Sequence, residues 1–124
     1  MYLRDWIHVD DHCAAVWAVL QGGRLGACYN IGGESEIANL DIVRGIIAAL
    51  GKPDSLITFV TDRPGHDRRY AMNIDRIRED IGWQPVVSFG TGIQSTIEWY
   101  LQHEDWWRPL LGESGRVADT MYKS

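Results

Sequence analysis

Apolar residues recur at helical spacing in four segments of this 124-residue chain, and only two short runs between them suit a β-strand. In the first segment a helix is predicted to start after a cap at Asp10 or Asp11 and to end before the Gly22-Gly23 pair. Its apolar residues fall at i, i+3, i+4 and i+7, namely Cys13, Val16, Trp17 and Leu20. A stripe of this kind is typical of a helix that packs on a core.

Three later segments carry the same pattern. Asn39 and Asn73 stand at N-cap positions before the second and third segments, and Gly51 and Gly82 follow their last apolar residues. Gly90 opens the fourth segment. The predicted helices therefore cover 40–50, 74–81 and 90–101.

The two runs that favour a strand are 27–31, which is short and bounded by glycines, and 56–61, which is β-branched and aromatic. The order helix, strand, helix, strand, helix, helix predicts a mixed α/β fold with about four helices and two or three short strands. That is too few strands for a complete doubly wound sheet. Because 2–9 already has the pattern of ordered structure, we expect 1–124 to be a single truncated domain, with 108–124 as a weakly patterned tail.

Composition excludes several classes of protein. Hydrophobic residues make up 45% and charged residues 23%, as in ordinary folded domains, and the net charge of -5 argues against binding nucleic acid or an anionic membrane by bulk charge. No apolar stretch approaches the length that crosses a bilayer, so we expect a cytoplasmic protein. Cys13 and Cys28 are too few for a disulfide framework, and we expect buried, reduced thiols.

Several catalytic patterns can be set aside. His8 and His12 are four residues apart, but Val9 stands where a zinc protease needs its glutamate. The chain has no Gly-x-Ser-x-Gly nucleophile elbow and no Gly-x-Gly-x-x-Gly dinucleotide loop. It also lacks a tyrosine with a lysine four residues later, the pair used by short-chain dehydrogenases. The sequence therefore predicts no catalytic residue, no metal site and no cofactor site in this chain.

The most informative segment is 63–69, which holds three arginines and His66 within seven residues of an acidic protein. Pro64-Gly65 shapes the segment as a turn. Arginine forks and free backbone N–H groups are a common means of holding phosphate oxygens. The alternative is a solvated loop whose arginines pair with the carboxylates of Asp62, Asp67, Asp75 and Glu79. The pattern alone does not decide between the two.

Five short sequence motifs of this chain occur in the same order and at the same spacing in a known family. They are Arg4-Asp5-Trp6, Val9-Asp10-Asp11-His12, Tyr29-Asn30-Ile31-Gly32-Gly33, Asn39-Leu40, and the nine residues from Asp62 to Tyr70. The chain resembles the C-terminal part of a dTDP-glucose 4,6-dehydratase, an extended short-chain dehydrogenase, from Leu3 to about Trp107. The nine-residue string is highly specific, whereas the Tyr-Asn-Ile-Gly-Gly string is shared more widely among extended short-chain dehydrogenases.

The resemblance implies a set of ligand residues. Those that contact the nucleotide diphosphate in that family correspond to Arg4, Asn39, Arg63 and His66. Pro64, Gly65 and Asp67 would shape the loop, and Tyr122 is the candidate for a late tyrosine that touches the ligand, although 112–124 departs from the family pattern.

The resemblance also implies a ligand and a missing cofactor domain. The ligand would be a dTDP-sugar or a related nucleotide diphosphate, and the family's NAD site and catalytic Tyr-Lys pair lie in a Rossmann half that is not here. We therefore expect a substrate-binding portion without a complete Rossmann domain, inactive by itself. The alternatives are a module that associates with itself or a partner, as a homo-oligomer for example, and a half-enzyme that needs a separate Rossmann-domain chain.

Overall fold

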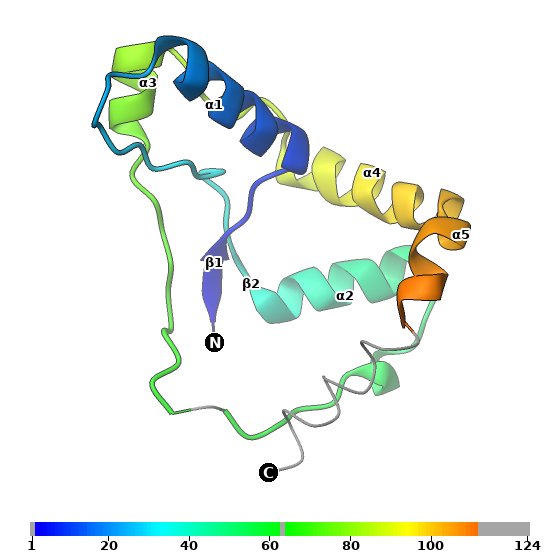
Figure 1. Cartoon of the computed structure of the whole chain (residues 1–124). Coiled ribbons are helices and arrows are strands. Elements are labelled where there is room, and N and C mark those ends of the chain that lie inside the picture. The colour runs from blue at the N-terminus through cyan, green and yellow to red at the C-terminus, as the bar shows by residue number, and fades with distance from the viewer. Residues whose placement is uncertain (1, 63, 112–124) are drawn as a thin grey trace.

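A computed structural model describes residues 2–62 and 64–111 (Figure 1). In chain order the elements are β1 (Leu3–Asp5), α1 (Val9–Gly22), β2 (Glu36–Ala38), α2 (Asn39–Ala49), η1 (Asp54–Leu56), α3 (Asp75–Ile81), α4 (Phe89–Gln102), α5 (Glu104–Trp107) and η2 (Arg108–Leu110). The mixed α/β class is confirmed, with the described residues forming one two-stranded sheet.

The sheet joins two strands that are far apart in the sequence. β1 and β2 run antiparallel, and Arg4 lies opposite Ile37. The other edge of β1 meets a segment near residue 69 through a parallel bridge, in which the N–H of Leu3 donates to the carbonyl of Arg68 at 2.9 Å and the N–H of Tyr70 donates to the carbonyl of Leu3 at 3.1 Å. β1 therefore lies between β2 and the arginine-rich segment, which brings Arg4 beside that segment.

The helices follow the predicted segments, but three of their caps differ. α1 is capped by His8, whose ring accepts the N–H of Asp10, and not by Asp10 or Asp11. Asn39 is the first residue of α2, whose N-cap is Ala38. Asn73 accepts the N–H of Asp75 two residues ahead of it, while Ile74 occupies the N-cap position.

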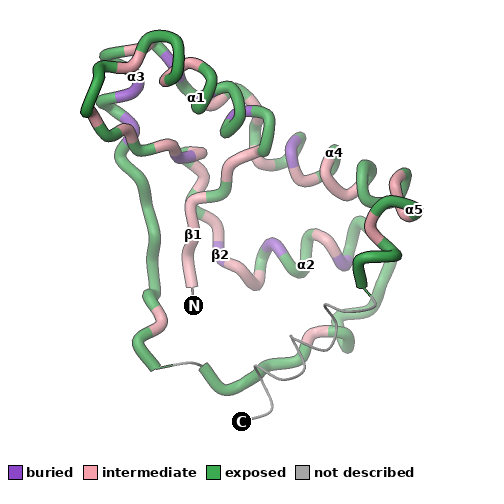
Figure 2. Tube along the Cα trace, viewed as in Figure 1, coloured by how far each residue is buried: buried purple, intermediate pink, exposed green. Residues whose placement is uncertain are grey.

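The main core lies where α1 packs on α3. The buried apolar residues there are Ala15, Ile74, Ile77 and Trp83, which we call the α1–α3 core. A second set of buried residues lies along β2 and α2, where α2 contacts α4, and consists of Ala38, Ile42 and Ile47. Figure 2 shows these positions as short purple stretches in a chain that is largely exposed or half-buried.

Among the residues that the structure describes, one buried side chain is charged. Asp11 on α1 is 3% exposed, and its carboxylate accepts the N–H of Val86 at 3.1 Å and the N–H of Val87 at 2.9 Å. Because buried polar groups are costly unless hydrogen-bonded, this pairing satisfies the carboxylate and two backbone donors at once. Asp11 therefore ties α1 to the segment that leads into α4.

Two expectations about strands are wrong. Within the described residues neither 27–31 nor 56–61 forms a strand. The first run has no regular secondary structure, and the second begins at Leu56, the last residue of the 3-10 helix η1, and has none after it. The strands that do form, β1 and β2, are only three residues long. They are too short to show the alternation of apolar and polar residues from which a strand is predicted.

The expectation about the buried face of α1 is also wrong. Val16, Trp17 and Leu20 are exposed to 51%, 59% and 74%, and Cys13 and Cys28 are exposed as well. The face that packs instead carries Asp11 and Ala15, with Ala18 and Val19 partly buried beside them. Both faces have helical spacing, so periodicity alone could not choose between them.

Candidate functional site

Arg4 projects from β1 toward the arginine-rich segment. Its guanidinium donates to the carbonyl of Leu3 at 2.7 Å and to the carbonyl of Asp67 at 3.0 Å, and one nitrogen lies 2.9 Å from Nε2 of His66. These three partners are neutral acceptors. Within the described part of the chain Arg4 forms no ion pair, so its positive charge is not offset by a carboxylate.

His66 is held on both edges and on one face. Its Nε2 meets Arg4, and its Nδ1 lies 2.6 Å from Oδ1 of Asp62. The ring of Tyr2 stacks on the imidazole with centroids 4.2 Å apart and an angle of 14° between the planes. The imidazole is therefore fixed between a cation, a carboxylate and an aromatic ring.

Tyr70 covers the guanidinium of Arg4. The guanidinium carbon lies 4.9 Å from the centre of the Tyr70 ring, and the Tyr70 hydroxyl donates to the carboxylate of Asp67. Aromatic faces attract cations, so this contact orients Arg4 without neutralising it. Gly65 has a φ of 70°, a left-handed conformation that lets the loop turn back toward β1 just before His66.

Asn39 lies at the margin of this group. Its N–H donates to the carbonyl of Tyr2 at 3.0 Å, which connects the start of α2 to the residue that stacks on His66. Its side-chain oxygen Oδ1 is buried and has no hydrogen-bond partner among the described residues. A buried oxygen of this kind is an available acceptor at the edge of the site.

The structure brings together much of the predicted site. Arg4, His66 and Asp67 lie in contact, and Pro64 and Gly65 form the turn before them. Arg63 and Tyr122 lie outside the described residues. Sequence reasoning missed three members that the contacts add, so the group we call the Arg4 cluster consists of Tyr2, Arg4, Asp62, His66, Asp67 and Tyr70.

One arginine of the segment is paired with a carboxylate, as the solvated-loop alternative expected, but the carboxylate is not one of the four that it named. Arg69 points away to a bidentate pair with Glu36 on β2, with N–O distances of 2.6 and 2.7 Å. The hydrogen bonds from Arg69 lower the pKa of Glu36, and those to Glu36 raise the pKa of Arg69. Arg69 therefore fastens the loop to the sheet, whereas Arg4 has no carboxylate partner within the described residues.

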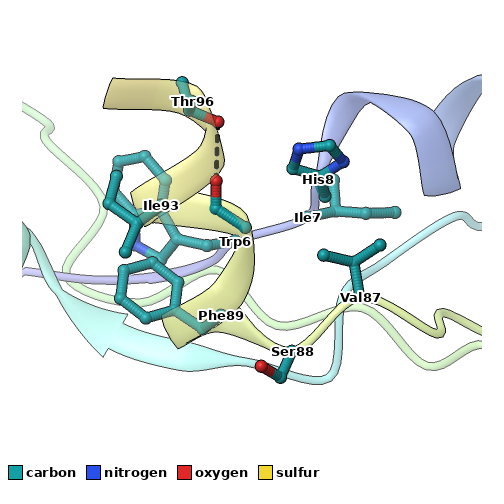
Figure 3. Close-up of a pocket in the computed structure, with 9 residues that line it drawn as sticks. Trp6, Ile7, His8, Val87, Ser88, Phe89, Ile93 and Thr96 are labelled. Atoms are coloured by element: carbon teal, nitrogen blue, oxygen red, sulfur yellow. Dashed lines mark hydrogen bonds between the residues drawn. The ribbon is translucent and has the colours of Figure 1, made fainter. Parts of the chain in front are cut away.

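Two adjoining hollows lie on another part of the surface, between the chain before α1 and helix α4. Figure 3 shows the smaller one, of about 180 Å³, lined mainly by apolar side chains; the larger measures about 600 Å³. In the wall of the larger hollow, Ser95 Oγ lies 3.4 Å from His8 Nε2, while Nδ1 of His8 accepts the N–H of Asp10. Neutral His8 therefore carries its proton on Nε2, which leaves that nitrogen unable to act as a base toward Ser95.

Neither a metal cluster nor a membrane helix is found in the described residues. No group of three or more histidine, cysteine, aspartate or glutamate side chains there is arranged to hold a metal ion. Similarly, none of the described helices is long and apolar enough to cross a bilayer.

Comparison with known proteins gives a consistent result. A family model described as GDP-mannose 4,6 dehydratase matches residues 1–96. The chain is 44% identical to the dTDP-glucose 4,6-dehydratase of Xanthomonas campestris pv. campestris, over 93% of this chain and 35% of that protein. It is 43% identical to the Escherichia coli enzyme of the same name, over 90% of this chain and 34% of the relative.

Solved structures agree with this similarity. The dTDP-glucose 4,6-dehydratase of Bacillus anthracis in complex with NAD has a TM-score of 0.82 at 47% identity, covering 89% of this chain and 35% of that one. The Streptomyces venezuelae enzyme of the same name, also with NAD bound, has a TM-score of 0.83 at 40% identity, covering 88% and 34%. The chain therefore spans about a third of the length of the relatives that it matches.

Proposed function

The chain belongs to the GDP-mannose 4,6 dehydratase family, and we propose that it is the nucleotide-sugar-binding portion of a dTDP-glucose 4,6-dehydratase. The observation that carries this proposal is the environment of Arg4. Its side chain is half-buried, its guanidinium lies over the ring of Tyr70, and within the described residues it is hydrogen-bonded only to neutral acceptors. A cation placed in this way favours an anion. The name that these relatives share supplies the class of anion, a nucleotide diphosphate attached to a sugar.

Each member of the proposed site has a separate task. Arg4 exchanges its neutral acceptors for diphosphate oxygens, for which a guanidinium fork is a stronger donor. His66 lies beside it and contacts the same oxygens. The buried Oδ1 of Asn39 accepts a hydrogen bond from the ligand's polar groups. Arg63, outside the described residues, adds a second guanidinium to the diphosphate.

The residues of this chain do not fit NAD, the cofactor in the related structures. A dinucleotide site needs a parallel strand that leads through a glycine-rich turn into a helix. The described residues form only an antiparallel two-stranded sheet, and the sequence has no Gly-x-Gly-x-x-Gly. We therefore assign no group of this chain to hydride transfer, and its proposed contribution is to bind and orient the substrate.

The proposal is tested by calorimetric titration of the whole chain with dTDP-glucose. We expect saturable binding, and we expect Arg4→Ala to raise Kd by about 10- to 100-fold because it removes charge-assisted hydrogen bonds. Arg24→Ala is the matched control, since it deletes an arginine that bonds Asp80 in a different cluster. Equal losses in the two variants, or no binding by a folded chain, would overturn the proposal.

An interaction module is the second candidate, and the exposed face of α1 favours it. Val16, Trp17 and Leu20 form an apolar stripe that no described residue covers, and stripes of this kind mark surfaces of association. Light scattering after size exclusion measures self-association directly, and mixing with a separate Rossmann-domain chain measures partner binding. This candidate would be contradicted if the protein is a monomer that does not bind the added chain, and if Trp17→Glu leaves its measured mass unchanged.

A further inference from the structure

The hydrogen bonds of His66 fix which of its nitrogens carries the proton. A guanidinium has donors only, so the 2.9 Å contact with Arg4 requires that Nε2 of His66 accept. The proton of the neutral ring is therefore on Nδ1, which donates to Oδ1 of Asp62 at 2.6 Å. A protonated imidazole would place an N–H against the guanidinium, so the arrangement requires neutral His66.

The groups that face His66 come from three parts of the chain. Arg4 is on β1, Tyr2 precedes β1 and stacks on the ring, and Asp62 lies four residues before His66. The carboxylate of Asp67, the next residue, accepts the Tyr70 hydroxyl. Within the described residues Asp62 is thus the one carboxylate bonded to the imidazole, and Arg4 is the one cation bonded to it.

A diphosphate would change the partner of Nε2. Phosphate oxygens at neutral pH are acceptors, and they draw the donors of Arg4 toward themselves. Nε2 then loses its donor and faces oxygens that cannot donate to it. It can bond to them only after binding a proton, and the imidazolium so formed is stabilised by phosphate on one side and by Asp62 on the other.

We propose that Asp62 is a positioning residue of this site and that His66, held by Asp62, takes up a proton when a diphosphate binds. The proton comes from solvent and is added to Nε2, while Nδ1–H remains on Asp62; no covalent bond forms or breaks. The inference rests on the proposed function of nucleotide-sugar binding. It adds a proton to the binding equilibrium and a residue, Asp62, to the site.

The experiment is calorimetry with dTDP-glucose in two buffers of different ionisation enthalpy, at the same pH near 7.5. Both phosphates of dTDP-glucose are esterified, so the ligand has no phosphate proton that titrates near neutrality. Histidine is the side chain that changes charge in this range. We expect the observed binding enthalpy to depend on the buffer in the sense of proton uptake, and we expect this dependence to vanish in His66→Gln.

The variants of Asp62 separate positioning from general stability. Asp62→Asn keeps an oxygen that accepts Nδ1–H but removes the charge that supports an imidazolium, so binding should require a lower pH to reach the same affinity. Asp62→Ala removes both and should weaken binding about tenfold at pH 7.5. Asp54→Asn, an exposed aspartate in η1, is the control and should leave the pH profile unchanged.

The outcomes distinguish this inference from the proposed function. Saturable binding with no dependence on the buffer, or proton uptake that persists in His66→Gln, would overturn the role of His66 and leave nucleotide-sugar binding intact. A pH profile in Asp62→Asn that coincides with that of the wild type would overturn the role of Asp62. The absence of binding by the folded chain would overturn both proposals.

Discussion

The side chains that hold α1 against α3 are apolar and buried, whereas those gathered around Arg4 are polar and only half-buried or exposed. The α1–α3 core excludes water, and its contribution scales with the apolar area that it buries. In the Arg4 cluster, folding replaces hydrogen bonds to water by hydrogen bonds within the protein, so the net contribution to stability is small. Substitutions in the core should therefore change stability, whereas substitutions in the cluster should change binding.

The largest effect is expected from Ile77→Ala in the core. Ile77 is fully buried, so the substitution leaves a cavity and should lower the free energy of unfolding by about 2 to 5 kcal/mol. Urea denaturation measures the loss. Leu20→Ala on the exposed face of α1 is the control, expected to change stability by no more than about 0.5 kcal/mol. A loss at Leu20 equal to that at Ile77 would show that the exposed face is covered in solution.

A smaller loss of stability is expected from substitutions of Asp11, the buried aspartate on α1. Asp11→Ala leaves the N–H groups of Val86 and Val87 without their acceptor and should destabilise the fold by about 1 to 3 kcal/mol. Asp11→Asn keeps one acceptor oxygen and should therefore destabilise the fold less than Asp11→Ala does. Thermal unfolding of the two variants compares them, and an Asn variant less stable than the Ala variant would refute this account.

Arg4→Ala should affect stability less than either core substitution. Its hydrogen bonds are to neutral acceptors at a partly exposed position, so we expect a loss of about 1 kcal/mol or less despite the large loss of dTDP-glucose affinity. Denaturation and titration of the same sample measure both quantities. A stability loss equal to that of Ile77→Ala would remove the distinction between the two regions.

The smallest effect is a pH dependence from the exposed pair that fastens the loop. Because Arg69 lowers the folded-state pKa of Glu36 below the ordinary glutamate value of 4.5, the unfolded chain binds the proton more readily. The pair therefore stabilises the fold above pH 4.5, and this contribution is lost as the pH falls through the lowered pKa. Glu36→Gln should flatten the acid side of the stability profile, measured by urea denaturation.

Glu79→Gln serves as the control for this pH dependence, because Glu79 is an exposed glutamate on α3. Its acid profile should follow that of the wild type. An unchanged profile in Glu36→Gln would mean that the Arg69 pair does not persist in solution.

Much of the helical part of the fold could be predicted from the sequence. Apolar spacing located α1, α2, α3 and α4, and Gly82 ends α3 with the left-handed φ of 77° that a glycine stop predicts. The nine-residue string from Asp62 to Tyr70 also pointed to the family, which the matching family model confirms. Each of these signals is local, because a helix closes its hydrogen bonds within four residues.

The sequence predicted some members of the candidate site but none of the contacts between them. The motif indicated Arg4, His66 and Asp67, but nothing in the sequence indicates that Tyr2 stacks on the imidazole or that Asp62 fixes its proton. These relations depend on β1 lying beside the segment near residue 69, across more than sixty positions of chain.

The sequence by itself determined where helices form and which charged residues share one loop, since periodicity and composition act over a few residues. The tertiary structure alone decided which face of α1 is buried, which short segments pair as β1 and β2, and which atoms Arg4 and His66 contact. A strand needs a partner and a buried face needs a neighbour, so these features depend on distant residues and leave no local pattern.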